Sequence, residues 1–428
     1  MPTNFIEELR WRGMVQDIMP GTEEQLSKEM TTGYVGFDPT ADSLHVGNLL
    51  PITLLMHMQR AGHRPIALVG GATGMVGDPS GKSAERNLLD EETLAHNIAG
   101  QTAQLEKFLD FDSAKENGAL LVNNYDWMKK FSFIEFIRDV GKHITVNYMS
   151  AKDSVKKRVE TGLSFTEFSY QLLQGHDFVH LYKTLDCKLQ MGGSDQWGNI
   201  TTGTELIRRM TGGSAFAFTC PLLTKADGGK FGKTESGTVW LDPEKTSPFE
   251  FYQFWLNASD EDAKKLIRFY TFLDKETIEK IEAEHNEAPH LRKLQNAIAD
   301  DVTARVHGKE ALETAKIASK ILFSKSTEED LKQLTNAQFL SIFDGVQQAT
   351  VSKDLLAGEG LSIVQALASE TGFLKSNGEA KRELKGNAIS VNKTKVKEDF
   401  MISKDQLIND RFVLLGKGKK NNYILVVE

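Results

Sequence analysis

Between Tyr34 and Leu223, short apolar runs alternate with longer segments of helical pattern, and no other feature constrains the fold as strongly. Parallel strands need long crossover connections, so this alternation indicates βαβ units. Between the first two runs, Leu44–Ala61 is predicted to form a helix because its apolar residues recur at helical spacing. The predicted fold class is α/β with a doubly wound parallel sheet, which binds ligands at the carboxyl ends of its strands. The predicted strands are Tyr34–Phe37, Pro65–Val69, Ala119–Asn123, Cys187–Met191 and Phe216–Cys220.

After Gly237 the pattern becomes helical, with little sign of strands. Helices are predicted at Ser247–Leu256, Asp260–Leu273 and Lys275–Phe323. The segment Thr350–Gly360 has mixed polarity and two glycines, which favours a linker. Beyond it, Ser376–Asn392 and the hairpin-like Arg411–Glu428 predict a small α+β module. The chain is therefore predicted to divide into a sheet domain at 1–225, a helical domain at 226–345, and a linker with the small module at 346–428.

The composition excludes several classes of protein. With 428 residues, a net charge of −8 and 40% hydrophobic residues, the chain can hold two or three domains with apolar cores. Disorder, collagen and coiled coil are poor descriptions of it. Its two cysteines cannot build a disulfide framework or a zinc site, so we expect a cytoplasmic location and no metal site. No segment has the pattern of a signal peptide or a membrane span, so no membrane partner is expected.

The segment from Gly36 to Asn48 leaves the first predicted strand and enters the first predicted helix. His45 and Asn48 are three residues apart, so they share a face of the first helical turn and can donate hydrogen bonds to phosphate oxygens there. Gly47 lacks a side chain, which would let a flat base approach the backbone. Taken alone, this pattern is more often a capped helix with a surface histidine.

A second polar segment, Lys225–Gly237, is rich in glycine and lysine. Lys230 and Lys233 could close over a polyphosphate and neutralise charge on a leaving group. Taken alone, it is most simply an ordinary surface loop.

In this order, with βαβ units between them, the two segments resemble the HIGH and KMSKS signatures of class I aminoacyl-tRNA synthetases, which have a Rossmann-like catalytic domain. The surrounding residues resemble the bacterial tyrosyl-tRNA synthetases over essentially the whole chain. The matching segments are Tyr34–Asn48, Gly62–Arg86, Tyr170–Asp177, Gln190–Gly198 and Lys230–Thr234.

The resemblance implies a tyrosine pocket. Tyr34 and Asp177 would contact the phenolic hydroxyl, and Gln196 would lie near the carboxylate. Asp78, Tyr170 and Gln174 would accept hydrogen bonds from the ammonium group. From the residues alone, Tyr170, Gln174 and Asp177 share one helix face through their spacing, although a solvated polar face is the simpler explanation of that pattern.

The resemblance also implies an ATP site and a reaction. Tyrosine would attack the α-phosphorus of ATP to give tyrosyl-adenylate and pyrophosphate, and would then pass to the 3′ end of tRNA(Tyr). No protein nucleophile is needed, so catalysis would rest on positioning and charge stabilisation. Mg²⁺ is expected to accompany ATP, with no tightly bound cofactor. The ATP-binding residues would be Gly36, Asp38, Gly47, Gly193, Asp195 and Lys233. The catalytic residues would be Thr40, His45, Asn48, Lys82, Arg86, Lys230, Lys233 and Thr234.

The C-terminal part carries a second resemblance. Residues 351–428 hold 13 Lys and Arg against 10 Asp and Glu, on a chain that is acidic overall. On charge alone a solvated face is the commoner explanation. However, Ser376–Arg382 followed by Gly386–Asn392 is similar to the small RNA-binding fold of one ribosomal small-subunit protein. Its RNA-binding residues would be Lys381, Arg382, Lys385, Lys393 and Lys395, through phosphate contacts.

The family resemblance further implies a homodimer. Phe131, Phe133 and Phe136 are candidates for its interface, and a buried core cluster is an equally good explanation of these three residues.

Two residues depart from the family pattern. Asn48 replaces the second histidine of the first signature, so it can donate a hydrogen bond but cannot become cationic. Val35 replaces a cysteine that some relatives place beside the ribose.

Three alternatives stay open. A tryptophanyl-tRNA synthetase shares both signatures, but Tyr34 with Asp177 argues against it. A non-catalytic synthetase-like RNA-binding protein should have lost Asp78, Gln196 or Lys233. A nucleotidyltransferase of small metabolites would not need the tyrosine pocket.

Overall fold

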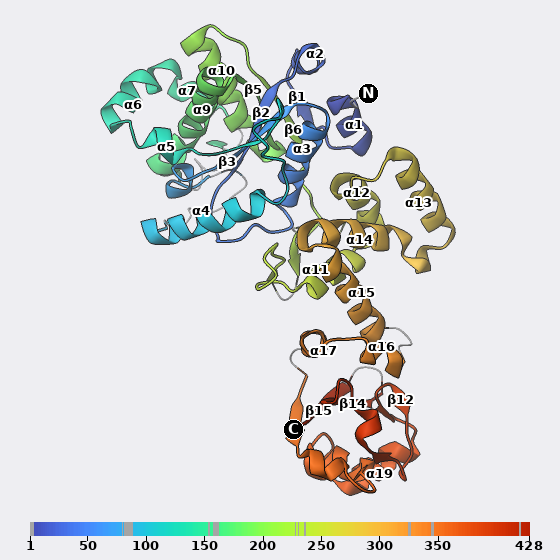
Figure 1. Ribbon diagram of the computed structural model, residues 1–428. Coiled ribbons are helices and arrows are strands. Elements are labelled where there is room, and N and C mark those ends of the chain that lie inside the picture. The colour runs from blue at the N-terminus through green and yellow to red at the C-terminus, as the bar shows by residue number, and fades with distance from the viewer. Residues whose placement is uncertain are drawn as a thin grey trace. The chain divides into compact units, whose positions relative to one another are not determined.

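The computed structural model describes residues 4–78, 80, 89–152, 155–156, 162–226, 228–229, 231–234, 237–323, 327–343, 346–418 and 421–428. The chain forms two compact units, Met1–Gly308 and Lys309–Glu428 (Figure 1). None of the helices among these residues combines the length and the hydropathy that a membrane span requires.

A six-stranded sheet forms the centre of the first unit, in the order β1-β6-β5-β2-β3-β4. Neighbouring strands are parallel except β1, which pairs with β6 in the antiparallel direction. The bounds are β1 (Asp17–Ile18), β2 (Thr32–Phe37), β3 (Arg64–Val69), β4 (Leu120–Asn123), β5 (Cys187–Gly193) and β6 (Phe216–Cys220). All five predicted strands and the doubly wound class are confirmed. The two-residue strand β1 was missed because it is too short to carry a pattern.

The strand order reverses beside β2. The chain continues from β2 to β3 and β4 on one side, whereas β5 and β6 lie on the other side. Such a switch point leaves a crevice at the carboxyl ends of the strands, between their outgoing connections. The ligand site is therefore expected outside the ends of β2 and β5.

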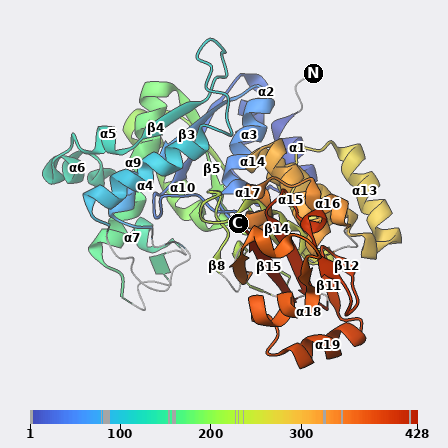
Figure 2. The same cartoon turned by 60° about the horizontal axis from the view of Figure 1, so that its bottom comes forward.

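Two long helices, α9 (Phe165–Leu185) and α10 (Trp197–Thr211), lie side by side next to β5 (Figure 1, Figure 2). A Cβ added to Gly175 would lie 2.8 Å from Leu206 Cδ1, and one added to Gly203 would lie 2.9 Å from Phe178 Cδ1. Glycine at both positions therefore permits the close approach of the two helices. The first unit also contains α1 (Phe5–Arg12), α2 (Thr22–Lys28), α4 (Glu91–Leu105), α5 (Tyr125–Met128), α6 (Phe133–Asp139) and α7 (Val146–Ser150).

The predicted helix Leu44–Ala61 is shorter in the structure, where α3 spans Leu49–Arg60. The preceding residues pair instead with a segment far along the chain. Val46 N donates to Val239 O at 3.0 Å, and Leu241 N donates to Leu44 O at 2.8 Å. These bonds hold Leu44–Val46 extended, so the helical prediction was wrong for this turn.

The helical part of the first unit contains α11 (Pro248–Leu256), α12 (Asp260–Tyr270), α13 (Lys275–Glu287) and α14 (Lys293–His307). Ser247 caps α11 in a capping box with Glu250. The predicted helix Asp260–Leu273 ends three residues early. The helical character predicted for Lys275–Phe323 is confirmed, but the stretch is divided, because the chain breaks at Arg292 (φ 51°) and Gly308 (φ 91°) before α15 (Lys309–Phe323) begins. Left-handed backbone cannot continue an α-helix.

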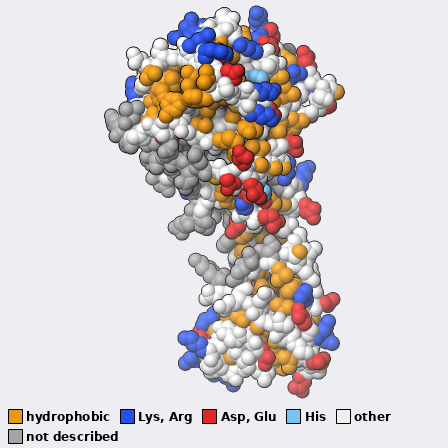
Figure 3. All heavy atoms as spheres, turned by 90° about the vertical axis from the view of Figure 1, so that its left-hand side faces the viewer, with side chains coloured by type: hydrophobic (Ala, Val, Ile, Leu, Met, Phe, Trp, Pro, Cys, Tyr) orange, Lys and Arg blue, Asp and Glu red, His pale blue; other side chains and the backbone are white. Residues whose placement is uncertain are grey.

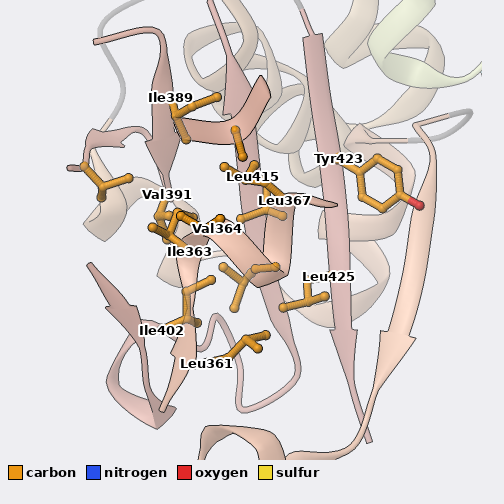
Figure 4. Packing of buried hydrophobic residues seen from close by; sticks show 14 of the residues in the cluster. Leu361, Ile363, Val364, Leu367, Ile389, Val391, Ile402, Leu415, Tyr423 and Leu425 are labelled. Atoms are coloured by element: carbon orange, nitrogen blue, oxygen red, sulfur yellow. The ribbon is translucent and has the colours of Figure 1, made fainter. Parts of the chain in front are cut away.

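The second unit contains a five-stranded sheet in the order β12-β11-β14-β15-β9. Its core includes Ile389, Val391, Leu415 and Leu425 (Figure 4). The strands are β9 (Gln348–Val351), β11 (Ile389–Val391), β12 (Thr394–Lys395), β14 (Phe412–Lys417) and β15 (Asn421–Val427), with β10 (Leu361–Ser362) and β13 (Met401–Ile402) forming a separate pair. The helices are α15, α16 (Glu328–Lys332), α17 (Asn336–Ile342), α18 (Ile363–Gln365) and α19 (Asn377–Lys385).

The predicted α+β character of this unit is confirmed, and so is the hairpin, which β14 and β15 form. The predicted linker Thr350–Gly360 is partly wrong. Its first residues belong to β9, which pairs with β15 in the parallel direction. The mixed polarity of β9 arises because this edge strand buries only Val351.

One face of the first unit exposes apolar side chains around α6 (Figure 3). Phe133 is 67% exposed and Ile134 is 75% exposed. Val146, at the start of α7, and Phe165, at the start of α9, are also largely exposed. We call the three exposed apolar residues of α6 itself, Phe133, Ile134 and Ile137, the α6 patch.

The three phenylalanines considered for an interface differ in their surroundings. Phe133 belongs to the α6 patch. Phe131 and Phe136 are half-buried and contact each other and the ring of His176. Phe136 also packs against the hydrophobic core.

Candidate active site

A cavity of about 460 Å³ lies at the switch point of the sheet. The structure brings fourteen of the predicted site residues together around it. They are Tyr34, Gly36, Asp38, Thr40, His45, Gly47, Asn48, Asp78, Tyr170, Gln174, Asp177, Gly193, Asp195 and Gln196. Lys82, Arg86 and Lys230 lie outside the described residues. Lys233 and Thr234 form β7, which pairs with β8 (Gly237–Thr238), and only their backbone is described.

The buried end of the cavity holds Tyr34 and Asp177, which are 1% and 2% exposed. The Asp177 carboxylate accepts a hydrogen bond from Asn124 Nδ2 at 2.9 Å and one from Trp127 Nε1 at 2.8 Å. The hydroxyl of Tyr34 has no hydrogen-bond partner in the described part of the chain. A buried hydroxyl without a partner is costly, so this end is suited to receive another polar group.

Burial also controls the ionisation of this pair. It raises the pKa of Asp177 to about 7, against the opposing effect of the bonds from Asn124 and Trp127. Burial, with the nearby Asp177 carboxylate, raises the pKa of Tyr34 well above its ordinary value. Tyr34 is thus a neutral hydroxyl, and Asp177 is an acceptor that changes charge near neutral pH.

The middle of the cavity is built around Asp38. Its carboxylate accepts a hydrogen bond from Tyr170 Oη at 2.9 Å and one from Thr73 Oγ1 at 2.8 Å. Thr73 in turn accepts from Asn124 Nδ2 at 3.1 Å. Asp38 and Asp177 are therefore joined through one network of hydrogen bonds, which links the predicted adenosine side to the predicted tyrosine side.

Acceptors for a cation lie beside this network. Gln196 Nε2 donates to Asp78 Oδ2 at 2.6 Å, and Ser80 N donates to Asp78 Oδ1 at 2.9 Å. Asn199 Nδ2 bonds the amide oxygen of Gln196 at 3.2 Å. The buried amide oxygen of Gln174 has no partner among the described residues. A carboxylate and an amide oxygen are the acceptors that an ammonium group requires.

The turn that carries the first signature differs from the prediction. His45 and Asn48 precede α3 and do not share a face of its first turn. His45 Nδ1 accepts from Gly47 N at 3.0 Å, which leaves Nε2 as the position for a donor proton. Asn48 Oδ1 accepts from His45 N at 3.0 Å, which leaves the amide NH₂ as its donor. Both side chains can still donate to an anion, but from a tight turn and not from a helix face.

Sequence reasoning missed several residues of the network, namely Thr73, Ser80, Asn124, Trp127 and Asn199. It also missed Gln190, which lines the cavity. Asn124 directly follows β4, at the end of the sheet where ligands bind, so its position was a usable signal. Trp127 carried no comparable signal, because an indole in a short helix is usually core.

No group of three or more His, Cys, Asp and Glu side chains among the described residues is arranged to hold a metal ion. Cys187 and Cys220 are both buried free thiols.

The predicted RNA-binding residues lie on and after α19 in the second unit. Lys381, Arg382 and Lys385 are exposed on this helix. Lys381 Nζ pairs with Glu398 Oε1 at 3.0 Å, and Lys395 Nζ donates to Ala388 O at 2.9 Å. Burial lowers the pKa of Lys393.

The comparison with known proteins gives two family matches. Residues 26–324 match the family described as "tRNA synthetases class I (W and Y)". Residues 338–426 match the "Tyrosine--tRNA ligase SYY-like C-terminal domain". With the doubly wound sheet and the cavity at its switch point, these matches define a class I tRNA synthetase of the tryptophan and tyrosine group.

Relatives that match over nearly their full length identify the family within this class. The chain is 62% identical over 429 residues to the tyrosine–tRNA ligase of Flavobacterium johnsoniae, covering 99% of each chain. It is 60% identical over 430 residues to that of Porphyromonas gingivalis, covering 99% of this chain and 100% of the relative. The chain belongs to the bacterial tyrosine–tRNA ligases. The predicted family and enzyme class are confirmed, and the three alternatives are not supported.

Solved structures agree with this assignment. A C-terminally truncated mitochondrial tyrosyl-tRNA synthetase of Aspergillus nidulans is 32% identical with a TM-score of 0.67, covering 75% of this chain and 94% of that one. A tryptophanyl-tRNA synthetase of Encephalitozoon cuniculi has a TM-score of 0.52 at 13% identity, covering 79% of this chain and 90% of that one. The second likeness shows a common fold alone.

Proposed function

We propose that the chain activates L-tyrosine with ATP and transfers the tyrosine to the 3′ end of tRNA(Tyr). The observation that carries this proposal is the buried Tyr34 hydroxyl beside the Asp177 carboxylate. A phenol entering the cavity can donate to Asp177 and accept from Tyr34. Phenylalanine would leave the buried Tyr34 hydroxyl without a partner and would offer no donor to the Asp177 carboxylate, and a site built to bond a hydroxyl rejects an analogue that lacks it.

The activation step would be an in-line displacement at phosphorus. An oxygen of the tyrosine carboxylate forms a bond to the α-phosphorus, the bond to the bridging oxygen breaks, and pyrophosphate leaves. Asp78, Tyr170 and Gln174 would hold the ammonium, with Gln196 near the carboxylate. Because charge moves onto pyrophosphate, donors placed at its oxygens would lower the barrier. In this proposal these donors are Thr40, His45, Asn48, Lys82, Arg86, Lys230, Lys233 and Thr234.

ATP would bind across the ends of β2 and β5. Gly36, Asp38, Gly47, Gly193 and Asp195 would contact the adenosine. A Cβ on Gly193 would lie 2.6 Å from Asp195 Oδ1, so glycine there keeps this carboxylate in place for a ribose hydroxyl. Mg²⁺ would enter as the counterion of ATP, since this ion commonly binds through substrate phosphates and keeps several waters.

We further propose that the second unit binds tRNA through phosphate contacts. Lys381 and Lys395 would exchange their present partners for phosphate, whereas Arg382 and Lys385 are exposed at the end of α19. Lys393 would complete the site. Contacts of this kind predict an affinity that falls steeply with salt. The three-part division at residues 225 and 345 and a cytoplasmic location belong to the same proposal.

A homodimer is proposed through the α6 patch. Monomeric proteins rarely leave several large apolar side chains exposed together, and such patches often bind another protein. Phe133, rather than Phe131 or Phe136, would make the main contact, because the other two are already engaged within the unit.

The interface is tested by replacing Phe133 with aspartate. A buried charge at the centre of an interface should weaken association by about 2 kcal/mol or more, roughly thirtyfold. Light scattering after gel filtration should give the mass of two chains for the unaltered protein and of one chain for Phe133→Asp at low concentration. Leu291→Asp, at an exposed leucine outside the patch, is the control and should stay dimeric. An unchanged mass for Phe133→Asp would place the interface elsewhere.

The proposed function is tested by pyrophosphate exchange into ATP, with tyrosine, phenylalanine and tryptophan offered separately. Exchange with tyrosine alone is expected. Exchange with tryptophan alone would overturn the pocket assignment, and exchange with none would overturn the adenylate chemistry.

A further inference from the structure

The turn of the first signature is bound to the segment that follows the second signature. The two backbone bonds that join Leu44–Val46 to Val239–Leu241 pair His45 with Trp240 in an antiparallel β-bridge. Val239 N also donates to Gly232 O at 3.1 Å. Each signature therefore has a backbone bond to Val239. Movement of one would strain the other.

A single buried side chain contacts both signatures. Tyr270, at the end of α12, is 0% exposed, and its hydroxyl donates to Val46 O at 3.2 Å. Its ring stacks on Phe231, with centroids 5.7 Å apart and planes at 21°. Phe231 lies between Lys230 and Gly232 and lines the active cavity.

Close packing fixes the positions of Tyr270 and of the second signature. Trp255 packs against Tyr270 with ring centroids 5.0 Å apart. Gly232 has φ 85°, and a Cβ there would lie 2.9 Å from Val46 Cγ2. The second signature therefore passes directly against the residue whose carbonyl Tyr270 holds. Burial raises the pKa of Tyr270 well above its ordinary value, so its hydroxyl stays a donor at every working pH.

We propose that Tyr270 is a positioning residue for tyrosine activation, which fixes the first signature through its hydroxyl and the second through its ring. The hydroxyl holds Val46 and so orients the neighbouring His45. The ring holds Phe231 and so fixes the backbone of the second signature at Phe231 and Gly232. This inference rests on the proposed function, because it assigns the two signatures to the phosphates of ATP. Tyr270 contacts neither substrate in this scheme.

Tyr270→Phe tests the hydroxyl while keeping the ring. The rate of pyrophosphate exchange at saturating substrates should fall about three- to tenfold, which corresponds to one lost hydrogen bond. The KM for tyrosine should stay within twofold, because the tyrosine pocket does not touch Tyr270.

The matched control is Tyr252→Phe. Tyr252 lies on α11 in the same helical part, is also buried, and donates to Asp300 Oδ1 at the same distance of 3.2 Å. This variant should lower the melting temperature about as much as Tyr270→Phe and leave the exchange rate unchanged. Equal rate losses in the two variants would reduce Tyr270 to a stabilising residue and overturn the inference.

A double-mutant cycle separates positioning from general destabilisation. If Tyr270 acts through His45, the effect of Tyr270→Phe on the exchange rate should shrink to less than twofold in a His45→Ala background. An undiminished effect would overturn the route through His45. Absence of exchange by the unaltered protein would instead be a failure of the proposed function.

Discussion

Replacement of Asp177 by alanine is expected to lower kcat/KM for tyrosine about a hundredfold in pyrophosphate exchange. The variant loses a hydrogen bond from the substrate phenol to a buried carboxylate, and such bonds contribute roughly 1.5–3 kcal/mol. It also removes the acceptor of Trp127 Nε1 and one of the two acceptors of Asn124 Nδ2. A loss of about 3 kcal/mol corresponds to roughly a hundredfold in rate.

Two comparisons make this result specific. The KM for ATP should change little, because Asp177 lies at the opposite, buried end of the cavity. Asp186→Asn changes an exposed carboxylate at the end of the same helix and should leave kcat/KM within twofold. An unchanged kcat/KM in Asp177→Ala would remove Asp177 from the recognition of the phenol.

The pH profile gives an independent check on the same group. The phenol needs the ionised carboxylate, and the pKa of Asp177 is about 7. For the unaltered protein, kcat/KM for tyrosine should therefore be level above pH 7 and fall about tenfold per pH unit well below it. Asp177→Ala should lose this inflection.

The raised pKa of Asp177 also makes the stability of the folded state depend on pH. The folded pKa of Asp177 lies above the unfolded value, so the folded state binds the extra proton between the two pKa values. Ionised Asp177 therefore reduces stability, from about pH 4 upward until the effect is complete near pH 7. The recognition group is kept at a cost to the fold, as is common for functional sites.

The sheet could be predicted from the sequence because its strands are short apolar runs buried on both faces. Ile66, Leu68 and Val69 in β3 illustrate this pattern, since all three are buried. The turn at Leu44–Val46 could not be predicted in this way. Its apolar residues fit helical spacing equally well, and only the distant partners Val239 and Leu241 decide the conformation.

The site residues also fall into those that could be predicted from the sequence and those that could not. His45, Asp78 and Asp177 lie in segments whose residue order is distinctive enough to identify from one sequence. Trp127 becomes part of the site only through its 2.8 Å contact with Asp177 across the fold. The role of Tyr270 likewise depends on a contact between residues far apart in the chain, with Val46. Residues that act through other residues leave little trace in local sequence.

The second large effect concerns Lys233 and the chemical step. Its backbone forms the hairpin of β7 and β8, paired with Thr238, and the following residue Val239 is bonded to Val46. The hairpin that carries this ammonium group is therefore anchored beside the turn that carries His45. In the proposed function, Lys233 neutralises charge as it develops on the leaving pyrophosphate.

Lys233→Ala is accordingly expected to slow formation of tyrosyl-adenylate about 10²- to 10³-fold, the usual effect of removing one donor from a developing anion. The Kd for tyrosine, measured by equilibrium binding without ATP, should stay within twofold, because the charge that Lys233 meets arises only in the transition state. Single-turnover kinetics with saturating ATP separate the two quantities.

Lys233→Arg keeps the charge and should recover part of the rate. Lys265→Ala, at an exposed lysine on α12, should behave as the unaltered protein. Equal losses in rate and in tyrosine affinity would instead make Lys233 a residue of the ground-state pocket, and the catalytic contribution of the second signature would then have to come from Lys230 and Thr234.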